Sequence, residues 1–509
     1  MRFRAGALCA ILGVAMVVAS LAAWWSDAAA ARHVRRSNAA APAPTITVGS
    51  PLPVQPIRSG FLGLSFEYWA LEHYAGTNPN AVDPILEQLI TNLTQGAPTV
   101  IRIGGISTDR TWWPVPGVPR SPAGYYTLTT RRLQVAQSLA QNTNAKLILG
   151  VNFEADSFRE AQAESQAMMR VVGSRWIDGL ELGNEPELYG NRWFYQRDGT
   201  DVFARPPTWD FQSFLPDYLH MVSALGRAPL AGPGIGALTW MQYLNDFLNT
   251  KRVSVVTLHR YPLQSCGPTP GQPKYPSIPH LLSATSSRGL ADVFQPYVEI
   301  AHAHGEQVRN AEMNSVSCGL AGAWGSANTF AGALWALDTM FAMASVGVDG
   351  VNIHTYAGAP DELFSISHVH GRWRAYVAPE YYGVLMFSEA APPGSRLLQI
   401  SGVSGTGTVR AWATRTPDGE VNVVLINDAT GHPQDLTVQV PGSMPEGTLE
   451  RLSAPRVQAT SGVTIGGQSF GRETTTGLPA GAFRFQLLPR ARTLHIFLPA
   501  ASAAMLTFG

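Results

Sequence analysis

Short apolar runs rich in β-branched residues alternate with longer stretches of helical periodicity between about residues 60 and 355. The longer stretches carry apolar residues three and four positions apart, as helices packed on a sheet do. They include residues 84–93, 157–172, 214–225 and 329–346. Such alternation is typical of βα units and a parallel sheet. The predicted strands are residues 61–66, 99–104, 146–152, 177–184, 228–236, 253–259, 308–314 and 350–355.

Eight strands with about as many helices in roughly 300 residues fit an α/β fold of the (β/α)8 or TIM-barrel type. A doubly wound open sheet is the alternative, but its first strand usually leads into a Gly-rich nucleotide-binding turn. Here the first strand continues into SFEYW, so we favour the barrel. The weakest of the predicted strands is 228–236, because its Gly and Pro residues also suit a loop.

After residue 388 the chain changes to short segments that alternate apolar and polar residues between Gly- and Pro-containing turns. This pattern predicts a C-terminal antiparallel β-sandwich. The predicted organisation is a signal peptide or anchor at 1–31, a flexible Ala/Pro linker at 32–44, an N-terminal strand joining the sandwich at 45–58, the catalytic barrel at 59–387 and the sandwich at 388–509.

The first 31 residues follow the order of a secretory signal, with Arg2 and Arg4, then an apolar run, then small residues. The apolar run is also long enough for an uncleaved anchor, so both outcomes stay open and cleavage is favoured. Either way we expect a secreted or extracytoplasmic protein, which contacts a membrane only if this segment is kept.

Composition removes several classes of partner. Lysine plus arginine and aspartate plus glutamate each number 36, whereas nucleic-acid binders show a basic excess, so no nucleic-acid partner is predicted. No HExxH or cysteine cluster and no Walker or dinucleotide loop occurs, so neither a metal nor a cofactor is predicted. The oligomeric state is left open.

Two glutamates stand at the ends of predicted barrel strands, where side chains face the active site of such a fold. Glu185 lies in ELGNEPE after the fourth strand, and Glu312 lies in RNAEMNS at the end of the seventh. Cleavage of a glycosidic bond needs two carboxyl groups that flank the bond, one of them as a proton donor of raised pKa. A capping carboxylate is the alternative for either residue alone, but the pair favours glycoside hydrolysis.

Other strand ends supply possible helpers. Buried Arg102 is expected to pair with Glu312 and keep it ionised, although a purely structural ion pair is the alternative. Asn184 is suited to hydrogen-bond a sugar 2-hydroxyl, and Tyr261 to donate to Glu312. His259 is a candidate substrate-binding residue, although a histidine at such a position is more often a barrel residue with its hydrogen bonds satisfied than a catalyst. Three aromatic residues are possible sugar-stacking surfaces or simply packing, namely Tyr68, Trp112 and Trp113.

Beyond the N-terminal segment the chain has two cysteines, Cys266 and Cys318. Their spacing leaves a disulfide and two separate thiols equally open. They follow the sixth and seventh predicted strands, and adjacent loops on one barrel face bring Cα atoms within disulfide range. The barrel therefore favours a disulfide at the rim of the site.

At these residues the sequence resembles glycoside hydrolase family 79, the β-glucuronidases and heparanases, over nearly the whole exported chain. The similar stretches are GLSFE, IRIGG, LGNEPELYG, TLHRYPL and AEMNS. The resemblance implies a retaining enzyme with Glu185 as acid/base and Glu312 as nucleophile, and with Glu67 and Asn184 on the glycone hydroxyls. It also implies Tyr356 as a binder of the sugar carboxylate.

One departure bears on the substrate. Members of the family that act on glucuronides usually carry a tyrosine five residues after the nucleophile, where this chain has Ser317 followed by Cys318. The expected function is retaining hydrolysis of β-glycosides, with β-glucuronides first. A retaining β-glycosidase for another sugar, or an endo-acting enzyme on a glucuronan-like chain, is the second possibility, and a non-catalytic carbohydrate-binding barrel is the third.

Overall fold

We describe a computed structural model of the chain. It describes residues 43–509 except 319–320, 404–406 and 441–445. The expected signal or anchor at 1–31 and all but the end of the expected linker lie outside the described residues. Within the described part of the chain, no helix has both the length and the apolar character needed to span a bilayer.

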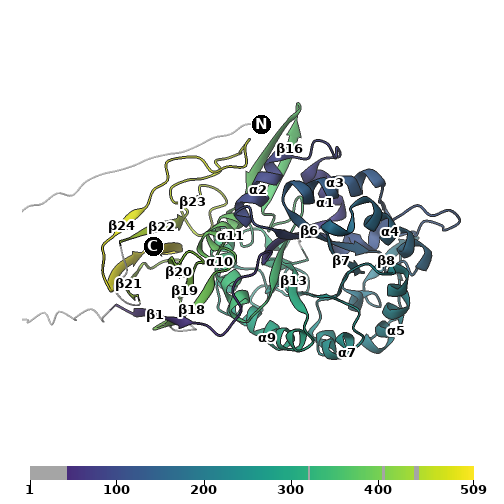
Figure 1. Ribbon diagram of the computed structural model, residues 1–509, viewed down its shortest axis with the longest axis horizontal. Helices are drawn as coiled ribbons and strands as arrows, with labels where there is room; N and C mark the ends of the chain where they lie inside the picture. Colours follow the sequence, from purple (N-terminus) through teal and green to yellow (C-terminus); the bar gives the residue numbers. More distant parts are fainter. Residues whose placement is uncertain (1–42, 319–320, 404–406, 441–445) are drawn as a thin grey trace, which may run out of the picture. The chain divides into compact units, whose positions relative to one another are not determined.

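The barrel predicted from the strand pattern is confirmed. Eight parallel strands close into a ring in the order β10-β11-β13-β15-β2-β3-β6-β7, with helices around it (Figure 1). Closure rules out the open doubly wound sheet. The strands are β2 (Leu62–Glu67), β3 (Thr99–Gly104), β6 (Ala145–Val151), β7 (Ile177–Leu182), β10 (Leu230–Ile235), β11 (Val255–His259), β13 (Gln307–Met313) and β15 (Gly350–Thr355).

The barrel strands are buried on both faces, which explains their continuous apolar runs. Even β10, the segment with Gly and Pro residues, is buried along its whole length and pairs with β7 and β11. Gly232 and Pro233 are therefore strand residues here. The strand is recognisable only through its neighbours, because its own composition suits a loop equally well.

The four stretches in which apolar spacing predicted a helix are helical, as α2, α4, α5 and α10. Helix α2 begins at Pro84, and the Asp83 carboxylate accepts a hydrogen bond from the Ile85 N–H, which caps its first turn. Helix α4 begins after Ser157, whose hydroxyl accepts from the Glu160 N–H. The helices are α1 (Tyr68–Ala75), α2 (Pro84–Thr94), α3 (Thr130–Asn142), α4 (Phe158–Val171), α5 (Phe211–Val222), α6 (Leu238–Met241), α7 (Leu244–Leu248), α8 (Ile278–Leu281), α9 (Arg288–Ala303), α10 (Phe330–Ser345) and α11 (Pro379–Ala390).

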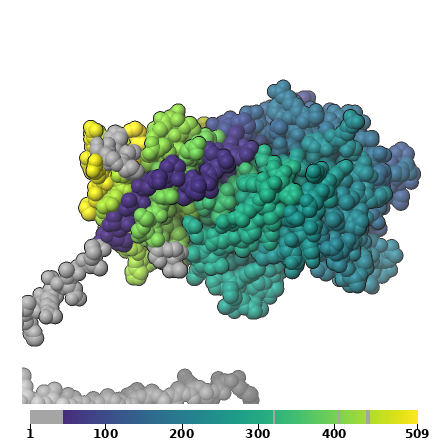
Figure 2. Space-filling view, turned by 60° about the horizontal axis from the view of Figure 1, so that its bottom comes forward, coloured from purple at the N-terminus to yellow at the C-terminus, as the bar shows by residue number. Residues whose placement is uncertain are grey.

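The C-terminal domain is a ten-stranded sheet that folds back on itself, since β25 at one end of the strand order also contacts β20 and β26. Its strands are β1 (Thr45–Pro51), β18 (Arg396–Ser401), β19 (Val409–Arg415), β20 (Val421–Asn427), β21 (Gln434–Gln439), β22 (Gly447–Ser453), β23 (Thr464–Ile465), β24 (Gln486–Leu488), β25 (Thr493–Leu498) and β26 (Ser502–Phe508). The sheet is mostly antiparallel, but β1 pairs parallel with β21 and antiparallel with β18. The N-terminal segment lies along the outside of the domain, coloured purple beside the green strands (Figure 2).

Two details differ from the sequence pattern. Residues 483–488, FRFQLL, alternate apolar and polar residues as a strand does, but only Gln486–Leu488 forms a strand, and Phe483 and Phe485 are about half exposed. Helix α11 runs from Pro379 to Ala390 and so crosses the expected boundary after residue 387. The apolar core is continuous here, because α11 and Trp412 of β19 belong to the same buried cluster as the barrel.

We call the contact of helices α10 and α11 with strands β19 and β22 the junction, and it also contains polar groups. Asp338 of α10 accepts a hydrogen bond from the Trp412 indole at 2.7 Å. Glu389 of α11 has a carboxylate oxygen, Oε2, without a hydrogen-bond partner among the described residues. Burial, and then the charge of Glu450 on β22, raises the pKa of Glu389 to about 8. The junction therefore favours a protonated Glu389 at neutral pH.

Candidate active site

The predicted site residues gather at one rim of the barrel, where the C-terminal ends of its parallel strands meet. Glu67 ends β2, His259 ends β11, Glu312 is the penultimate residue of β13, and Glu185 follows β7. One cleft contains all the predicted catalytic, substrate-binding and disulfide residues except Arg102, which lies beneath it. The predicted residues that line the cleft are Glu67, Asn184, Glu185, His259, Tyr261, Cys266, Glu312, Cys318 and Tyr356.

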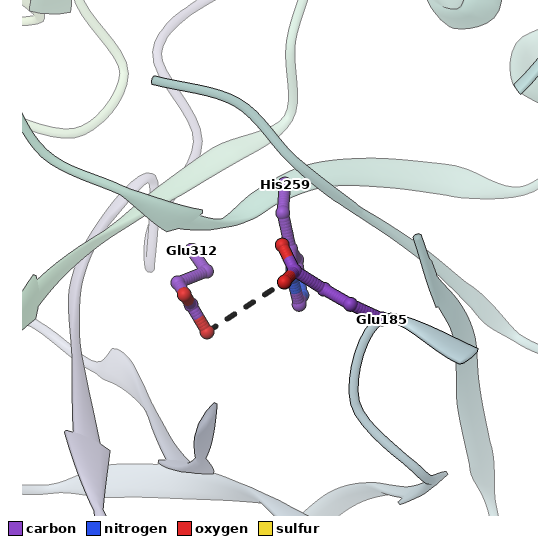
Figure 3. A group of neighbouring side chains, drawn as sticks. All are labelled: Glu185, His259 and Glu312. Carbon is purple, nitrogen blue, oxygen red and sulfur yellow. Dashed lines mark ion pairs between the residues drawn. The ribbon is translucent and has the colours of Figure 1, made fainter. Parts of the chain in front are cut away.

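The two central glutamates approach closely. A carboxylate oxygen of Glu185 and one of Glu312 lie within 4.8 Å of each other, and both groups point toward the imidazole of His259 (Figure 3). Glu185 adopts a left-handed conformation with φ of 51°, and its N–H donates to the Gly234 carbonyl at 2.9 Å. Positive φ is uncommon for a residue with a side chain and is often found at functional sites.

Arg102 is fully buried beneath the cleft and uses three of its nitrogens. Its Nε donates to Glu181 at 2.7 Å and its Nη1 to Glu312 at 2.8 Å. Nη1 also contacts the Ser65 hydroxyl, and Nη2 donates to the Asn184 side-chain oxygen at 2.8 Å. Burial by itself would lower the pKa of Arg102, but the charges of Glu181 and Glu312 outweigh it and raise that pKa. The guanidinium therefore stays charged and fixes two site residues together.

The Glu312 carboxylate is held in its ionised form. Burial by itself would raise its pKa, but His354, His259 and Arg102 outweigh burial and hold the pKa of Glu312 well below its usual range. The Tyr261 hydroxyl donates to the other carboxylate oxygen at 3.0 Å. Both oxygens thus accept a hydrogen bond, an arrangement that stabilises the charge and orients the group.

Glu67 is tied to the turn that follows β3. Its carboxylate accepts hydrogen bonds from the N–H groups of Ile106 and Ser107, at 3.2 and 2.8 Å, and from the Ser107 hydroxyl. His354 Nε2 lies 3.6 Å away, and the Nδ1 of His354 contacts Ser65. Burial would lower the pKa of His354, whereas Glu312 and then Glu67 raise it.

The expected disulfide is present at the rim of the cleft. Cys266 and Cys318 are bonded, with their Cα atoms 5.9 Å apart. Two short parallel strands lead into the bridge, β12 (Leu263–Gln264) and β14 (Val316–Ser317). Ser317 therefore belongs to one of two loops that the disulfide links, and its hydroxyl donates to the Leu263 carbonyl at 3.3 Å.

Tyr356 lines the cleft near several carboxyl groups. Its pKa is raised by burial first and then by Asp361, Glu67 and Glu312. Asp361 is buried, and its carboxylate accepts from the Val316 N–H and the Ser315 hydroxyl, at 3.2 and 3.3 Å. Burial nevertheless raises the pKa of Asp361 to about 6. The part of the cleft around Tyr356 is therefore rich in acidic groups.

Sequence reasoning missed several cleft residues, all on the segments that follow barrel strands. They are Glu187, Arg192, Trp193, Arg260, Lys274 and Asp361. Glu187 carried a weak signal, because it stands two positions after Glu185 in ELGNEPE. Its carboxylate accepts from the N–H groups of Gly236 and Ala237 at 2.5 and 2.7 Å, which fixes it on the loop after β10. The remaining residues had no pattern to distinguish them from ordinary loop residues.

The possible stacking aromatics are not in the cleft. Tyr68 is buried, and its hydroxyl donates to the Gly150 carbonyl at 2.6 Å, so it packs the barrel. Trp112 and Trp113 do not line the cleft either. The aromatic side chains that do line it are Tyr261, Tyr356 and Trp193, and Trp193 is half exposed.

Comparisons place this architecture in a known class of fold, the TIM barrel with an attached β-sandwich. No protein-family model matches the sequence, and the search of curated proteins found no match. Solved structures match over almost the whole chain. One is a 4-O-α-L-rhamnosyl-β-D-glucuronidase from Fusarium oxysporum, with a TM-score of 0.70 and 19% identity over 91% of this chain and 100% of that one.

Two further structures show the same fold. A family 51 arabinofuranosidase from Xanthomonas axonopodis pv. citri has a TM-score of 0.65 and 13% identity, covering 92% of this chain and 100% of its own. CelM2, a bifunctional glucanase-xylanase from a metagenome library, has a TM-score of 0.56 and 14% identity, covering 92% and 99%. The three neighbours are glycoside hydrolases of different specificity, and at these identities the similarity establishes the fold.

Proposed function

We propose that this protein is a retaining glycoside hydrolase that cleaves β-glycosidic bonds, with β-glucuronides as first substrates. The observation that carries the proposal is the approach of Glu185 and Glu312 to within 4.8 Å. Retaining enzymes place their carboxyl groups about 5–5.5 Å apart, whereas inverting enzymes leave about 6.5–9.5 Å for a water molecule. The similarity in fold to three glycoside hydrolases of known structure supports the same reaction class.

The hydrogen bonds support one assignment of roles. Glu312 receives donors from Arg102 and Tyr261, which favour its ionised form, so it is suited to attack the anomeric carbon. Glu185 is paired with no arginine or lysine in the described part of the chain, and its side chain is 24% exposed toward the cleft. It is therefore the better proton donor to the departing oxygen.

The reaction then runs in two steps. Glu312 forms an ester bond to the anomeric carbon while Glu185 protonates the oxygen of the breaking glycosidic bond, and the aglycone leaves as an alcohol. Glu185, now a carboxylate, takes a proton from water, whose oxygen attacks the same carbon and releases Glu312. Arg102 orients the Asn184 side chain, which supports a role for Asn184 in hydrogen-bonding the 2-hydroxyl in both transition states.

A neutral glycone is the second candidate, and the acidic groups near Tyr356 favour it. Tyr356 lies near Asp361, Glu67 and Glu312, which would repel a sugar carboxylate. The tyrosine expected five residues after the nucleophile is Ser317, tied into the disulfide-linked loops. Under this candidate the mechanism is unchanged and only the sugar differs.

The test is hydrolysis of an aryl glycoside panel that includes β-glucuronide, β-glucoside, β-xyloside and α-L-arabinofuranoside. Glu312→Gln should lower kcat by roughly 10⁴-fold or more, because no covalent intermediate forms. Glu185→Gln should recover turnover when azide replaces water as the attacking group, since azide needs no general base. Glu187→Gln is the matched control and should keep most of its turnover, because the amide oxygen still accepts both backbone N–H groups.

The panel separates the candidates. Turnover of the glucuronide alone selects the first candidate, and turnover of a neutral glycoside alone selects the second. A folded Glu312→Gln variant with substantial activity would overturn the assignment of the nucleophile. An azide product of inverted configuration would overturn retention.

A further inference from the structure

His259 is an unusual histidine for a barrel core. Its side chain is inaccessible to solvent, yet neither ring nitrogen has a hydrogen-bond partner among the described residues. Instead, Nδ1 faces two carboxylates, 3.5 Å from Glu185 Oε1 and 3.9 Å from Glu312 Oε2. A buried polar group without a partner is costly and calls for an explanation, such as a missing ligand.

We propose that Glu185, His259 and Glu312 form a binding site for a divalent transition-metal ion, with Zn²⁺ as the best fit. Each residue offers one ligand atom, and the three atoms lie within 4.8 Å of one another (Figure 3). Zn²⁺ binds imidazole nitrogen and carboxylate oxygen at about 2.0–2.2 Å in tetrahedral geometry, which separates neighbouring ligand atoms by about 3.3–3.5 Å. The His259–Glu185 spacing of 3.5 Å already matches, whereas Glu312 Oε2 lies 3.9 Å from His259 and needs a shift of roughly half an ångström. The two carboxylate oxygens, up to 4.8 Å apart, need to approach each other by up to about 1.3 Å.

The residues around the triad support metal binding. Arg102 and Tyr261 each donate to one oxygen of Glu312, and such outer hydrogen bonds orient a ligating carboxylate. Glu185 is held by its N–H bond to Gly234 and by the rigid turn at Pro186. The backbone positions of the ligands could therefore stay fixed while the two carboxylate groups rotate toward each other, and the fourth coordination position would face the open cleft.

The ligand types select the metal. One imidazole with two carboxylates suits Zn²⁺ and its neighbours in the transition series better than Mg²⁺ or Ca²⁺, which prefer six or more oxygen ligands. No spacing motif marks the site, because the ligands follow three different strands at positions 185, 259 and 312. Only the closure of the barrel brings them together.

Bound Zn²⁺ would regulate the same site. It would occupy both carboxylates that the proposed reaction needs, so it would compete with the glycoside. This inhibitory consequence rests on the proposed function, whereas binding itself rests only on the geometry of the triad.

Zn²⁺ binding is measured directly on the metal-free protein, without substrate, by calorimetry with ZnCl₂. We expect one saturable site, and at least tenfold weaker binding in His259→Gln and in Glu185→Gln. His302→Gln is the matched control, because His302 also lies beside a carboxylate, with Nε2 2.7 Å from Asp349, but outside the cleft. The Zn²⁺ affinity of His302→Gln should differ less than twofold from that of the wild type. Co²⁺ should give visible absorption typical of four or five ligands, which His259→Gln should alter.

Each outcome decides the proposal. Equal Zn²⁺ affinity in His259→Gln and the wild type would overturn it, as would loss of binding in His302→Gln alone or the absence of a saturable site. Zn²⁺ binding with the expected variant pattern supports it even if no glycoside is hydrolysed, and in that case the proposed function fails alone. If the protein hydrolyses a glycoside, binds no Zn²⁺ and keeps its activity when Zn²⁺ is added, the metal-site proposal is wrong and the proposed glycosidase function stands.

Discussion

Arg102→Lys tests whether the buried guanidinium fork supports both stability and chemistry. Arg102 bonds Glu181 through Nε, Glu312 and Ser65 through Nη1, and Asn184 through Nη2. A lysine keeps the charge but concentrates its donors on one nitrogen, so it cannot serve both carboxylates and the amide. We expect the loss of at least two charge-assisted hydrogen bonds, each about 1.5–3 kcal/mol, or about 3–6 kcal/mol in the free energy of unfolding.

The same change should alter the pH dependence of catalysis. With its cation displaced, the Glu312 carboxylate loses stabilisation and its pKa rises. The acidic limb of the kcat/KM profile should therefore move to higher pH. The assays are urea unfolding for stability and the pH profile of kcat/KM on the best aryl glycoside from the panel.

Arg374→Lys is the control for a surface arginine. Its ion pair with Glu473 at 3.1 Å is about half exposed on both sides, so the change should cost no more than about 1 kcal/mol. If Arg102→Lys is as stable as this control and has the wild-type acidic limb, then the buried network contributes neither stability nor ionisation of Glu312, and the reasoning is refuted.

Three further changes are expected to have measurable effects. Tyr261→Phe removes a donor to Glu312 and should lower kcat/KM by about 10–100-fold and shift its acidic limb upward, whereas an unchanged limb would contradict that donor's role. Glu389→Gln should stabilise the protein more at pH 8 than at pH 5. The unfolded glutamate ionises from about 4.5 while the folded group stays protonated to about 8, so wild-type stability falls by about 1.4 kcal/mol per pH unit between these values. An equal gain in melting temperature at both pH values would argue against a protonated Glu389. Replacing Cys266 and Cys318 by serine opens a crosslink of sequence separation 52 and should cost about 4 kcal/mol in chain entropy, checked by urea unfolding.

The barrel was predictable because strands buried on both faces produce continuous apolar runs that few other elements share. The strands of the C-terminal sandwich were harder to predict from the sequence. Strand β26 begins with three small residues, Ser502, Ala503 and Ala504, and is buried along most of its length, and β22 carries a buried charged residue, Glu450, so neither alternates clearly. At residues 483–485 the pattern misleads in the other direction, because apolar and polar residues alternate there but no strand forms.

The candidate site shows a similar division. Residues on strands, such as Glu67 and Glu312, were predictable because the barrel places every strand end at one rim. Loop residues such as Arg192 and Asp361 were not, since their position depends on tertiary contacts across several loops. The unpaired state of His259 was equally hidden, because a sequence shows a histidine but not the absence of a hydrogen-bond partner.

The parallel pairing of β1 with β21 has a consequence for the order of folding during synthesis. Thr47 of β1 and Gln439 of β21 contact each other across 392 positions of the chain. At a synthesis rate of about 5–20 residues per second, β1 waits roughly 20–80 s before this partner exists. The first strand made is thus among the last to be paired, and the barrel between them can form while the two ends of the chain are still unjoined. A ribosome-bound chain that stops short of β18, the other strand that pairs with β1, should accordingly expose β1 to protease, and the finished chain should protect it.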